Sequence, residues 1–212
     1  IAHFSKEQAE EMKRFKLSNF IEPASVPISL ISMIAGFCYS SVLSFLSFYT
    51  VEIGLVEASS FFFIVYAIVI LCSRPFTGRL FDLKGPNIIM YPAFLLYAVG
   101  LLVLSQVQNG VMLMVAAAII GLGFGNFQSS AQAIAIKQAP NHRAGLATST
   151  FFIFTDIGFG VGPYVLGFII PSLGYNGLYL AMGAIVFCMI IIYYFLHGKK
   201  ERTLKKAASY QL

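Results

Sequence analysis

Six long apolar stretches constrain the possible folds of this chain more than any other feature. A helix rises 1.5 Å per residue, so about 20 apolar residues suffice to cross the hydrocarbon core of a bilayer, which is about 30 Å thick. Charged residues make up only 11% of the chain, whereas a soluble domain contains about 25%. The sequence therefore predicts an all-α membrane protein with six transmembrane helices. Their approximate limits are 26–50, 59–80, 88–105, 111–136, 144–170 and 177–196, and the predicted breaks between them include Gly54, Gly85 and Asn176–Gly177.

The positive charges indicate how these spans are oriented. All 14 lysines and arginines lie in segments on one side of the predicted spans, whereas the loops on the other side carry Glu52 and Glu57 and no cation. Because Lys and Arg are enriched in cytoplasmic loops, we expect both ends of the chain on the cytoplasmic side. The expected parts are a cytoplasmic segment (1–25), a transmembrane domain (26–196) and a basic cytoplasmic tail (197–212). The net charge of +5 follows from this topology, and no other feature favours nucleic acid as a partner.

The sequence shows no arrangement of catalytic or metal-binding residues. The histidines lie in tails or loops, and the cysteines lie within apolar stretches, where buried, reduced thiols are the ordinary expectation. The motifs of metalloproteases, serine hydrolases and nucleotide-binding loops do not occur. We therefore expect a protein that is not an enzyme and that has neither a cofactor nor a metal site. The residues considered are His3, His142, His197, Cys38, Cys72 and Cys188.

The segment that leads from the end of the second span to the third, SRPFTGRLFDLKGPN (73–87), contains a spaced set of small and charged residues. Gly78 would permit a close helix approach, and Asp82 could meet the N-terminus of a neighbouring helix, whose dipole favours a carboxylate. Arg74 and Arg79 could anchor to phosphates or pair with Asp82. The spacing GxLxDxxG is formed by Gly78, Leu80, Asp82 and Gly85.

This spacing resembles the cytoplasmic loop motif of the major facilitator superfamily, which lies between the second and third helices of that family and recurs, more weakly, between the eighth and ninth. Pro86 and Asn87 stand where basic residues are usual, and this departure suits the weaker copy. The fifth span, HRAGLATSTFFIFTDIGFGVGPYVLG (142–167), resembles the eleventh helix of bacterial drug-efflux members. Its glycine–proline run also resembles the antiporter motif of the family's fifth helix. The residues that carry the resemblance to the eleventh helix are Arg143, Gly145, Asp156, Gly158, Gly162, Pro163 and Gly167.

The resemblance implies that the six spans are helices seven to twelve of a twelve-helix fold, that is, one half built from two inverted three-helix repeats. Residues 1–25 would then end the central cytoplasmic loop, and an N-terminal six-helix half would be the partner. The implied function is secondary active transport in a bacterial plasma membrane, as proton-coupled efflux of small amphipathic or drug-like compounds by alternating access. Its other partners would be the small-molecule substrate, protons and membrane lipid. The alternatives are an exporter of a specific metabolite or metallophore, an uptake carrier for a small organic solute, and a non-transporting receptor or scaffold.

The resemblance also assigns the motif after the second span to a cytoplasmic gate, formed by Gly78, Arg79, Asp82 and Gly85. We expect Asp82 to clamp the two halves together in the outward-facing state. Its replacement in Asp82→Asn should then lengthen distances across the cytoplasmic face. The alternative is that Asp82 only supports folding.

Asp156 is the one acidic side chain in the interior of the six spans. It follows Arg143 by 13 residues, about 20 Å along a helix, which places it near mid-membrane. A carboxylate there costs roughly 2.5–3.5 kcal/mol on insertion scales. Residues three or four positions from it are mostly small or polar, so we expect this face to point into the bundle and Asp156 to serve proton coupling or cation recognition; a neutral, structural acid is the alternative. The small or polar face holds Gly145, Ser149, Phe152, Gly160, Pro163 and Gly167, and the lipid face Phe154, Ile157, Val161, Val165 and Phe168.

Small residues in the same span have a separate expected role. Glycines permit close helix packing, and a proline kinks a helix. The same positions suit a hinge for alternating access. The predicted packing or hinge residues are Gly158, Gly162, Pro163 and Gly167.

Uncharged polar side chains form a second candidate site. Gln128 and Gln132 share a helical face with Gly121 and Gly125, and Asn126 lies beside it. Amides at this depth either hydrogen-bond to neighbouring helices or line a wet cavity. We expect cavity lining, because the resembled fold lines its cavity with this helix and with the first span. The opposing wall on the first span would hold Tyr39, Ser41 and Phe45, for which simple packing is the alternative.

Overall fold

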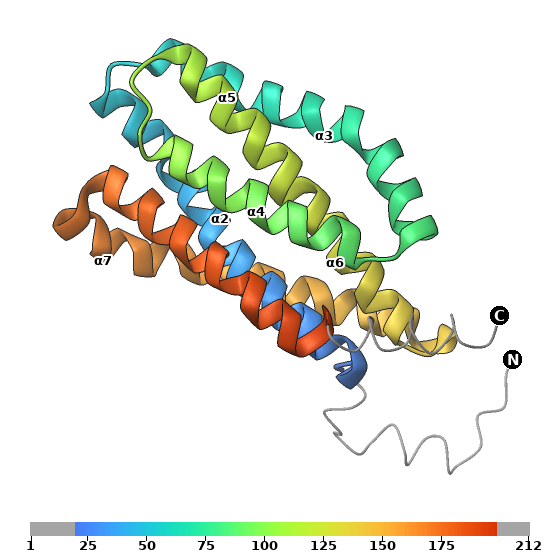
Figure 1. Ribbon diagram of the computed structural model, residues 1–212. Coiled ribbons are helices and arrows are strands. Elements are labelled where there is room, and N and C mark those ends of the chain that lie inside the picture. Colours follow the sequence, from blue (N-terminus) through green and yellow to red (C-terminus); the bar gives the residue numbers. More distant parts are fainter. Residues whose placement is uncertain (1–19, 199–212) are drawn as a thin grey trace, which may run out of the picture.

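The computed structural model describes residues 20–198, and every regular element in that range is helical (Figure 1). Most of the predicted cytoplasmic segment and basic tail falls in residues 1–19 and 199–212, which lie outside the described range. Short 3-10 or π-helical turns are labelled η. The elements are η2 (Pro23–Ser25), α2 (Val26–Glu52), α3 (Val56–Lys84), α4 (Asn87–Leu104), α5 (Gly110–Ile120), η3 (Gly121–Gly125), α6 (Asn126–Gln138), η4 (Asn141–Arg143), α7 (Ala144–Tyr193) and η5 (Tyr194–Gly198).

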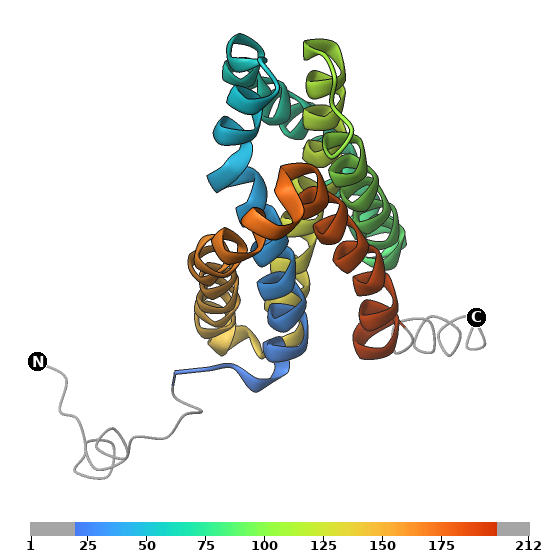
Figure 2. The same cartoon turned by 90° about the vertical axis from the view of Figure 1, so that its left-hand side faces the viewer.

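Five of the described helical stretches are long and apolar enough to cross a bilayer. The last of them contains α7, which is 50 residues long. A straight helix of that length would measure about 75 Å, more than twice the thickness of a hydrocarbon core. However, Gly174 has a φ of 66° and a ψ of 175°, which is not helical, and the chain turns back there. The long element therefore consists of two arms, 144–173 and 175–193, between which α2 passes (Figures 1 and 2).

The turn between these arms lies slightly upstream of its predicted position. The sequence placed the break at Asn176 and Gly177, but both residues are helical. The left-handed backbone of Gly174 explains the difference, because a residue without a Cβ adopts that conformation at little cost. The predicted breaks at Gly54 and Gly85 are confirmed, and these two glycines also have positive φ angles, of 70° and 82°.

Helix α3 continues further than predicted. It ends at Lys84, and the N–H of Gly85 donates to the Phe81 carbonyl at 2.9 Å. The residues from Gly78 to Lys84 therefore form the last turns of a helix, and the prediction that the helix ends at about Leu80 is wrong. As a result, the side chains of this motif have fixed directions relative to α6.

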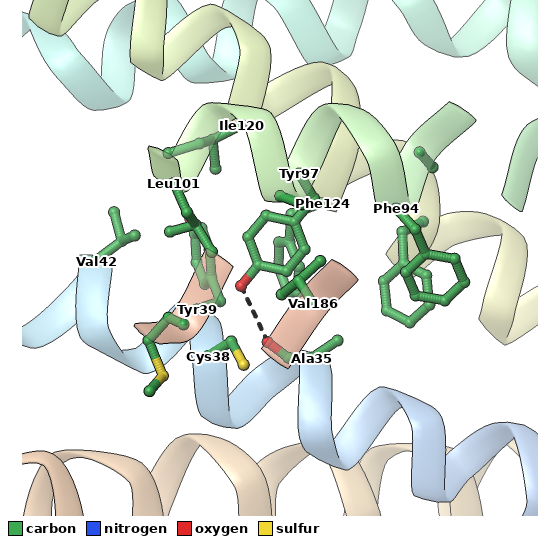
Figure 3. Packing of buried hydrophobic residues seen from close by; sticks show 14 of the residues in the cluster. Ala35, Cys38, Tyr39, Val42, Phe94, Tyr97, Leu101, Ile120, Phe124 and Val186 are labelled. Carbon is green, nitrogen blue, oxygen red and sulfur yellow. Dashed lines mark hydrogen bonds between the residues drawn. The ribbon is translucent and has the colours of Figure 1, made fainter. Parts of the chain in front are cut away.

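Helix α2 contributes to the core of the bundle along most of its length. Its most extensive contacts are with α7, while α4 packs on α7 and α5. The buried Tyr97 of α4 donates a hydrogen bond from its hydroxyl to the carbonyl of Ala35 in α2 at 3.2 Å (Figure 3). Segments from the start, middle and end of the described chain thus share one apolar core. Around this contact lie Cys38, Val42, Leu101, Ile120 and Val186.

Two surfaces expose many apolar side chains. On α3 only Phe62 and Phe81 are buried, and the first arm of α7 has an exposed apolar face. Exposed apolar surface on this scale is rare in soluble monomers and marks contact with lipid or with another part of a protein. The most exposed residues include Leu71, Phe76 and Leu83 on α3 and Ile157, Val161 and Phe168 on α7.

Candidate functional site

Four aromatic rings meet where α2, α3, η3 and the first arm of α7 come together. Tyr39 stacks on Phe124 with ring centroids 4.1 Å apart and an interplanar angle of 6°. The rings of Tyr66 and Phe159 lie 5.7 Å and 6.2 Å from that of Tyr39. Phe124 belongs to a π-helical turn, a feature that is frequent at functional sites. This aromatic cluster, comprising Tyr39, Tyr66, Phe124 and Phe159, links four elements at one point.

The three residues of the first span that were predicted to form a cavity wall have different surroundings. Tyr39 is buried within the aromatic cluster, and Phe45 is half-buried against the apolar core. Ser41 is fully buried; its hydroxyl donates to the Cys38 carbonyl at 2.6 Å, and its own carbonyl accepts from Tyr179 in the second arm of α7. The prediction that Ser41 lines a cavity is therefore wrong for this bundle, because its side chain is used within its own helix.

Asn126 connects α6 to α3. Its side chain is buried, and its Oδ1 accepts from the Thr77 hydroxyl at 2.8 Å. Its Nδ2 donates to the Ser73 hydroxyl at 3.0 Å and to the Leu122 carbonyl at 2.9 Å. The structure thus shows the bonding alternative rather than the expected cavity lining for this amide.

The Asn126 contacts lead to a stability prediction. Asn126→Leu should lower the free energy of unfolding by about 1–2 kcal/mol, because it removes the hydrogen bonds that hold α3 to α6. Thermal unfolding of the purified full-length protein in detergent measures this. Gln132→Leu is the matched control, since Gln132 makes no side-chain hydrogen bond to another residue of the described chain. Equal losses in the two variants would contradict the assignment.

The two glutamines of α6 are placed differently from each other. Gln128 is half-buried, and its Oε1 is buried without a hydrogen-bond partner among residues 20–198. Gln132 lines a pocket of about 420 Å³ between α3 and α6, which we call the α3–α6 pocket. The cavity role of Gln132 thus applies to a pocket at the predicted cytoplasmic end. The lining residues are Arg74, Thr77, Gly78, Phe81, Asp82, Ser129, Ser130, Gln132, Ala133 and Lys137.

Asp82 is paired within this bundle. Its carboxylate lies 3.1 Å from the Lys137 ammonium of α6, and both side chains are largely exposed. The same ammonium lies 4.5 Å from the centre of the Phe81 ring. The partner of Asp82 is therefore a lysine, and neither Arg74, Arg79 nor a helix N-terminus.

The other three residues of this motif differ in their surroundings. Gly78 has open space where a Cβ would be, so the predicted close helix approach at this glycine is wrong. Arg79 is exposed and lies outside the lining of the α3–α6 pocket. Gly85 ends α3 with its left-handed backbone.

Asp156 lies on an exposed face of the first arm of α7. Neighbours on that face, Phe152, Ile157 and Gly160, are also exposed. Asp156 does not point into the core of the described bundle. The stripe that packs on α2 runs through Gly158, beside the Asp156 stripe. Within the described chain the carboxylate has no ion pair or hydrogen-bond partner. The packed stripe consists of Ala147, Thr150, Phe151, Thr155, Gly158, Gly162 and Leu166.

The predicted packing residues fall on two sides of this helix. Gly158 contacts the α2 backbone at Met33, and Gly162 contacts Ser40. Pro163 is half-buried, while Gly167 has no neighbour within 4 Å of the position where a Cβ would be. Helix packing thus involves the first two glycines and excludes Gly167.

The sequence of the whole chain was compared with known families. A sequence profile described as Major Facilitator Superfamily matches residues 28–211. The chain belongs to the major facilitator superfamily. Proteins of this superfamily are membrane transporters rather than enzymes, which agrees with the apolar helices described above.

Curated relatives in the superfamily include proteins named multidrug resistance protein MdtG. The chain is 27% identical to the one from Salmonella dublin over 193 residues, which cover 84% of this chain and 48% of the relative. It is 28% identical to the one from Dickeya zeae over 178 residues, covering 81% of this chain and 43% of the relative. The chain therefore spans about half the length of the curated relatives it matches.

One ion pair joins Glu22, which precedes the superfamily match, to Arg143 within it, and it was not predicted from the sequence, which assigned residues 1–25 to a cytoplasmic segment. The Glu22 carboxylate lies 2.7 Å from the Nε of Arg143, with side-chain exposures of 6% and 31%. The Glu22 N–H also donates to the Thr150 hydroxyl at 2.8 Å. Just after it, the Ser25 hydroxyl donates to the Ala135 carbonyl at 2.8 Å. A single acid between Ile21 and Pro23 was the available signal.

Proposed function

We propose that this chain is the C-terminal six-helix half of a proton-coupled exporter of small amphipathic compounds, which works by alternating access. The two arms of α7 support six membrane crossings, since each arm has about the length that a crossing needs. Relatives about twice as long as this chain support an additional N-terminal half. The distribution of basic residues supports a bacterial plasma membrane orientation with both ends cytoplasmic.

The exposed position of Asp156 is the observation that carries this proposal. An ionised carboxylate facing lipid at mid-membrane is costly, and such acids almost always face a bundle interior or a water-filled cavity. In this bundle Asp156 faces neither, as its helix face is exposed. We infer that the N-terminal half covers this face and that a wet cavity between the halves contains Asp156, where it takes up and releases the transported proton.

The aromatic cluster supports amphipathic substrates. Phe159 lies one helical turn from Asp156 and is half-buried, so part of its ring remains accessible beside the carboxylate. Sites for such ligands are mostly apolar and aromatic, with a few polar groups that orient the ligand. The name of the relatives, multidrug resistance protein, is consistent with this substrate class.

The gate proposal for the end of α3 takes a modified form. In this bundle Lys137 holds Asp82. The same carboxylate would contact the N-terminal half only when this pair opens, and an exposed pair contributes so little that opening is easy. The gate would then consist of Asp82 with Gly78, Arg79 and Gly85.

Asp156→Asn tests the proposed function. In liposomes that contain the full-length protein, proton-driven substrate flux should fall to the level of protein-free liposomes, because the amide cannot exchange a proton. Substrate binding and energy-independent exchange should remain, since the amide has the shape of the protonated acid. Glu57→Gln is the control, because it removes an exposed carboxylate from the first turn of α3. Full proton-driven flux in Asp156→Asn would refute the proposal.

A further inference from the structure

We propose that the α3–α6 pocket binds the phosphate of an anionic phospholipid headgroup. This inference does not depend on the direction of transport or on the substrate. It rests on the charge of the lining, on the depth of the pocket and on the exposure of α3 around it.

The charges of the pocket favour an anion. Arg74 and Lys137 line it from opposite helices, against a single carboxylate, Asp82. Basic pockets between transmembrane helices on the cytoplasmic side are suited to anionic lipid headgroups. Further hydrogen-bonding groups of the lining come from Thr77, Ser129, Ser130 and Gln132.

The pocket lies at the depth of a headgroup. Thr77 lines the pocket and also donates a hydrogen bond to Asn126 at 2.8 Å, which joins α3 to α6 beside the pocket. At its rim lie Lys137 and Asp82, with side-chain exposures of 61% and 73%. These residues occupy the last turns of both helices, on the side of the membrane that the basic residues mark as cytoplasmic.

The surroundings favour a lipid over a free phosphate compound. Phe81 and Ala133 give the pocket an apolar part, which suits the glycerol end of an acyl chain. Leu71 and Phe76 lie close to Arg74 along α3 and are largely exposed, so they would offer acyl chains an apolar surface. A volume of about 420 Å³ exceeds the need of a bare phosphate and falls in the range of small-molecule sites.

The test measures binding of phosphatidylglycerol to the delipidated full-length protein by native mass spectrometry, with phosphatidylcholine as the neutral comparison. Arg74→Gln and Lys137→Gln should each weaken phosphatidylglycerol binding about fivefold, and the double variant about 30-fold, as each cation near a membrane surface contributes about that factor. Asp82→Asn should strengthen binding, because it removes the one repelling charge and releases Lys137. Arg79→Gln removes a cation from the same helix outside the pocket and should leave binding unchanged.

Four results would overturn the proposal. An unchanged affinity in the double variant would exclude the pocket, and an equal loss in Arg79→Gln would indicate general surface attraction only. Competition by soluble glycerol phosphate at the concentration of the lipid would assign the pocket to a free phosphate compound. A photoreactive group on Ser130→Cys that couples to another segment of the protein, instead of to phosphatidylglycerol, would show that the N-terminal half fills the pocket. Coupling to the lipid would support the proposal.

Discussion

Gly158→Ala should destabilise the bundle by about 3 kcal/mol or more, at the upper end of the range for overpacked cores. A methyl group at this position would overlap the Met33 carbonyl of α2 and lie 2.9 Å from the Phe37 nitrogen. Both are backbone atoms, so no side chain can rotate away and the two helices must separate. Gly162→Ala should cost less, because the nearest obstacle is the Ser40 side chain, although that hydroxyl is bonded to the Phe37 carbonyl.

The matched controls on the same helix should change stability in the opposite direction. Gly160 and Gly167 have no neighbour within 4 Å of a Cβ in this bundle. Alanine there should stabilise the helix by up to about 1 kcal/mol, as expected for a glycine in a helix interior. Thermal unfolding of the four single variants in detergent gives the comparison. Similar destabilisation at Gly158 and Gly160 would contradict the α2–α7 contact.

The packing of these glycines could be predicted only in part from the sequence. The sequence identified the span and its small residues, because those follow from hydropathy and spacing. It did not separate the stripe of Gly158 and Gly162 from the neighbouring stripe of Asp156 and Gly160. Lipid tails are as apolar as a leucine core, so hydropathy does not distinguish a buried face from a lipid-facing one. Which of two adjacent stripes is buried depends on where the neighbouring helix packs.

The polar residues show a second limit. The sequence identified Asn126 and Asp82 as candidate site residues, but not the helical position of Asp82 and not their partners Thr77 and Lys137. Those partners depend on how α3 is rotated against α6, and the predicted spans contain no information about that rotation. The contact between Asp82 and Lys137 also requires α3 to remain helical through Asp82. The prediction of a loop after Leu80 left the direction of that carboxylate open.

Breaking the buried pair of Glu22 and Arg143 should cost far more than breaking the exposed pair of Asp82 and Lys137. Removal of one partner of a buried pair typically costs about 3–5 kcal/mol, since it leaves an uncompensated charge. Arg143→Gln should fall in that range, because it leaves the buried carboxylate of Glu22 without its cation. Exposed pairs contribute about 0–1 kcal/mol. Lys137→Gln should accordingly leave the free energy of unfolding almost unchanged.

The two single variants of the buried pair should also differ in how far they lower the free energy of unfolding. Arg143→Gln leaves the carboxylate of Glu22, which is 6% exposed, without its cation, whereas Glu22→Gln leaves an arginine that is 31% exposed and that water can solvate. We therefore expect Arg143→Gln to be the more destabilising variant. Adding Glu22→Gln to Arg143→Gln should then restore stability, because the second change removes the unpaired charge. A double variant that unfolds at a lower temperature than Arg143→Gln alone would show that the pair does not act through buried charge.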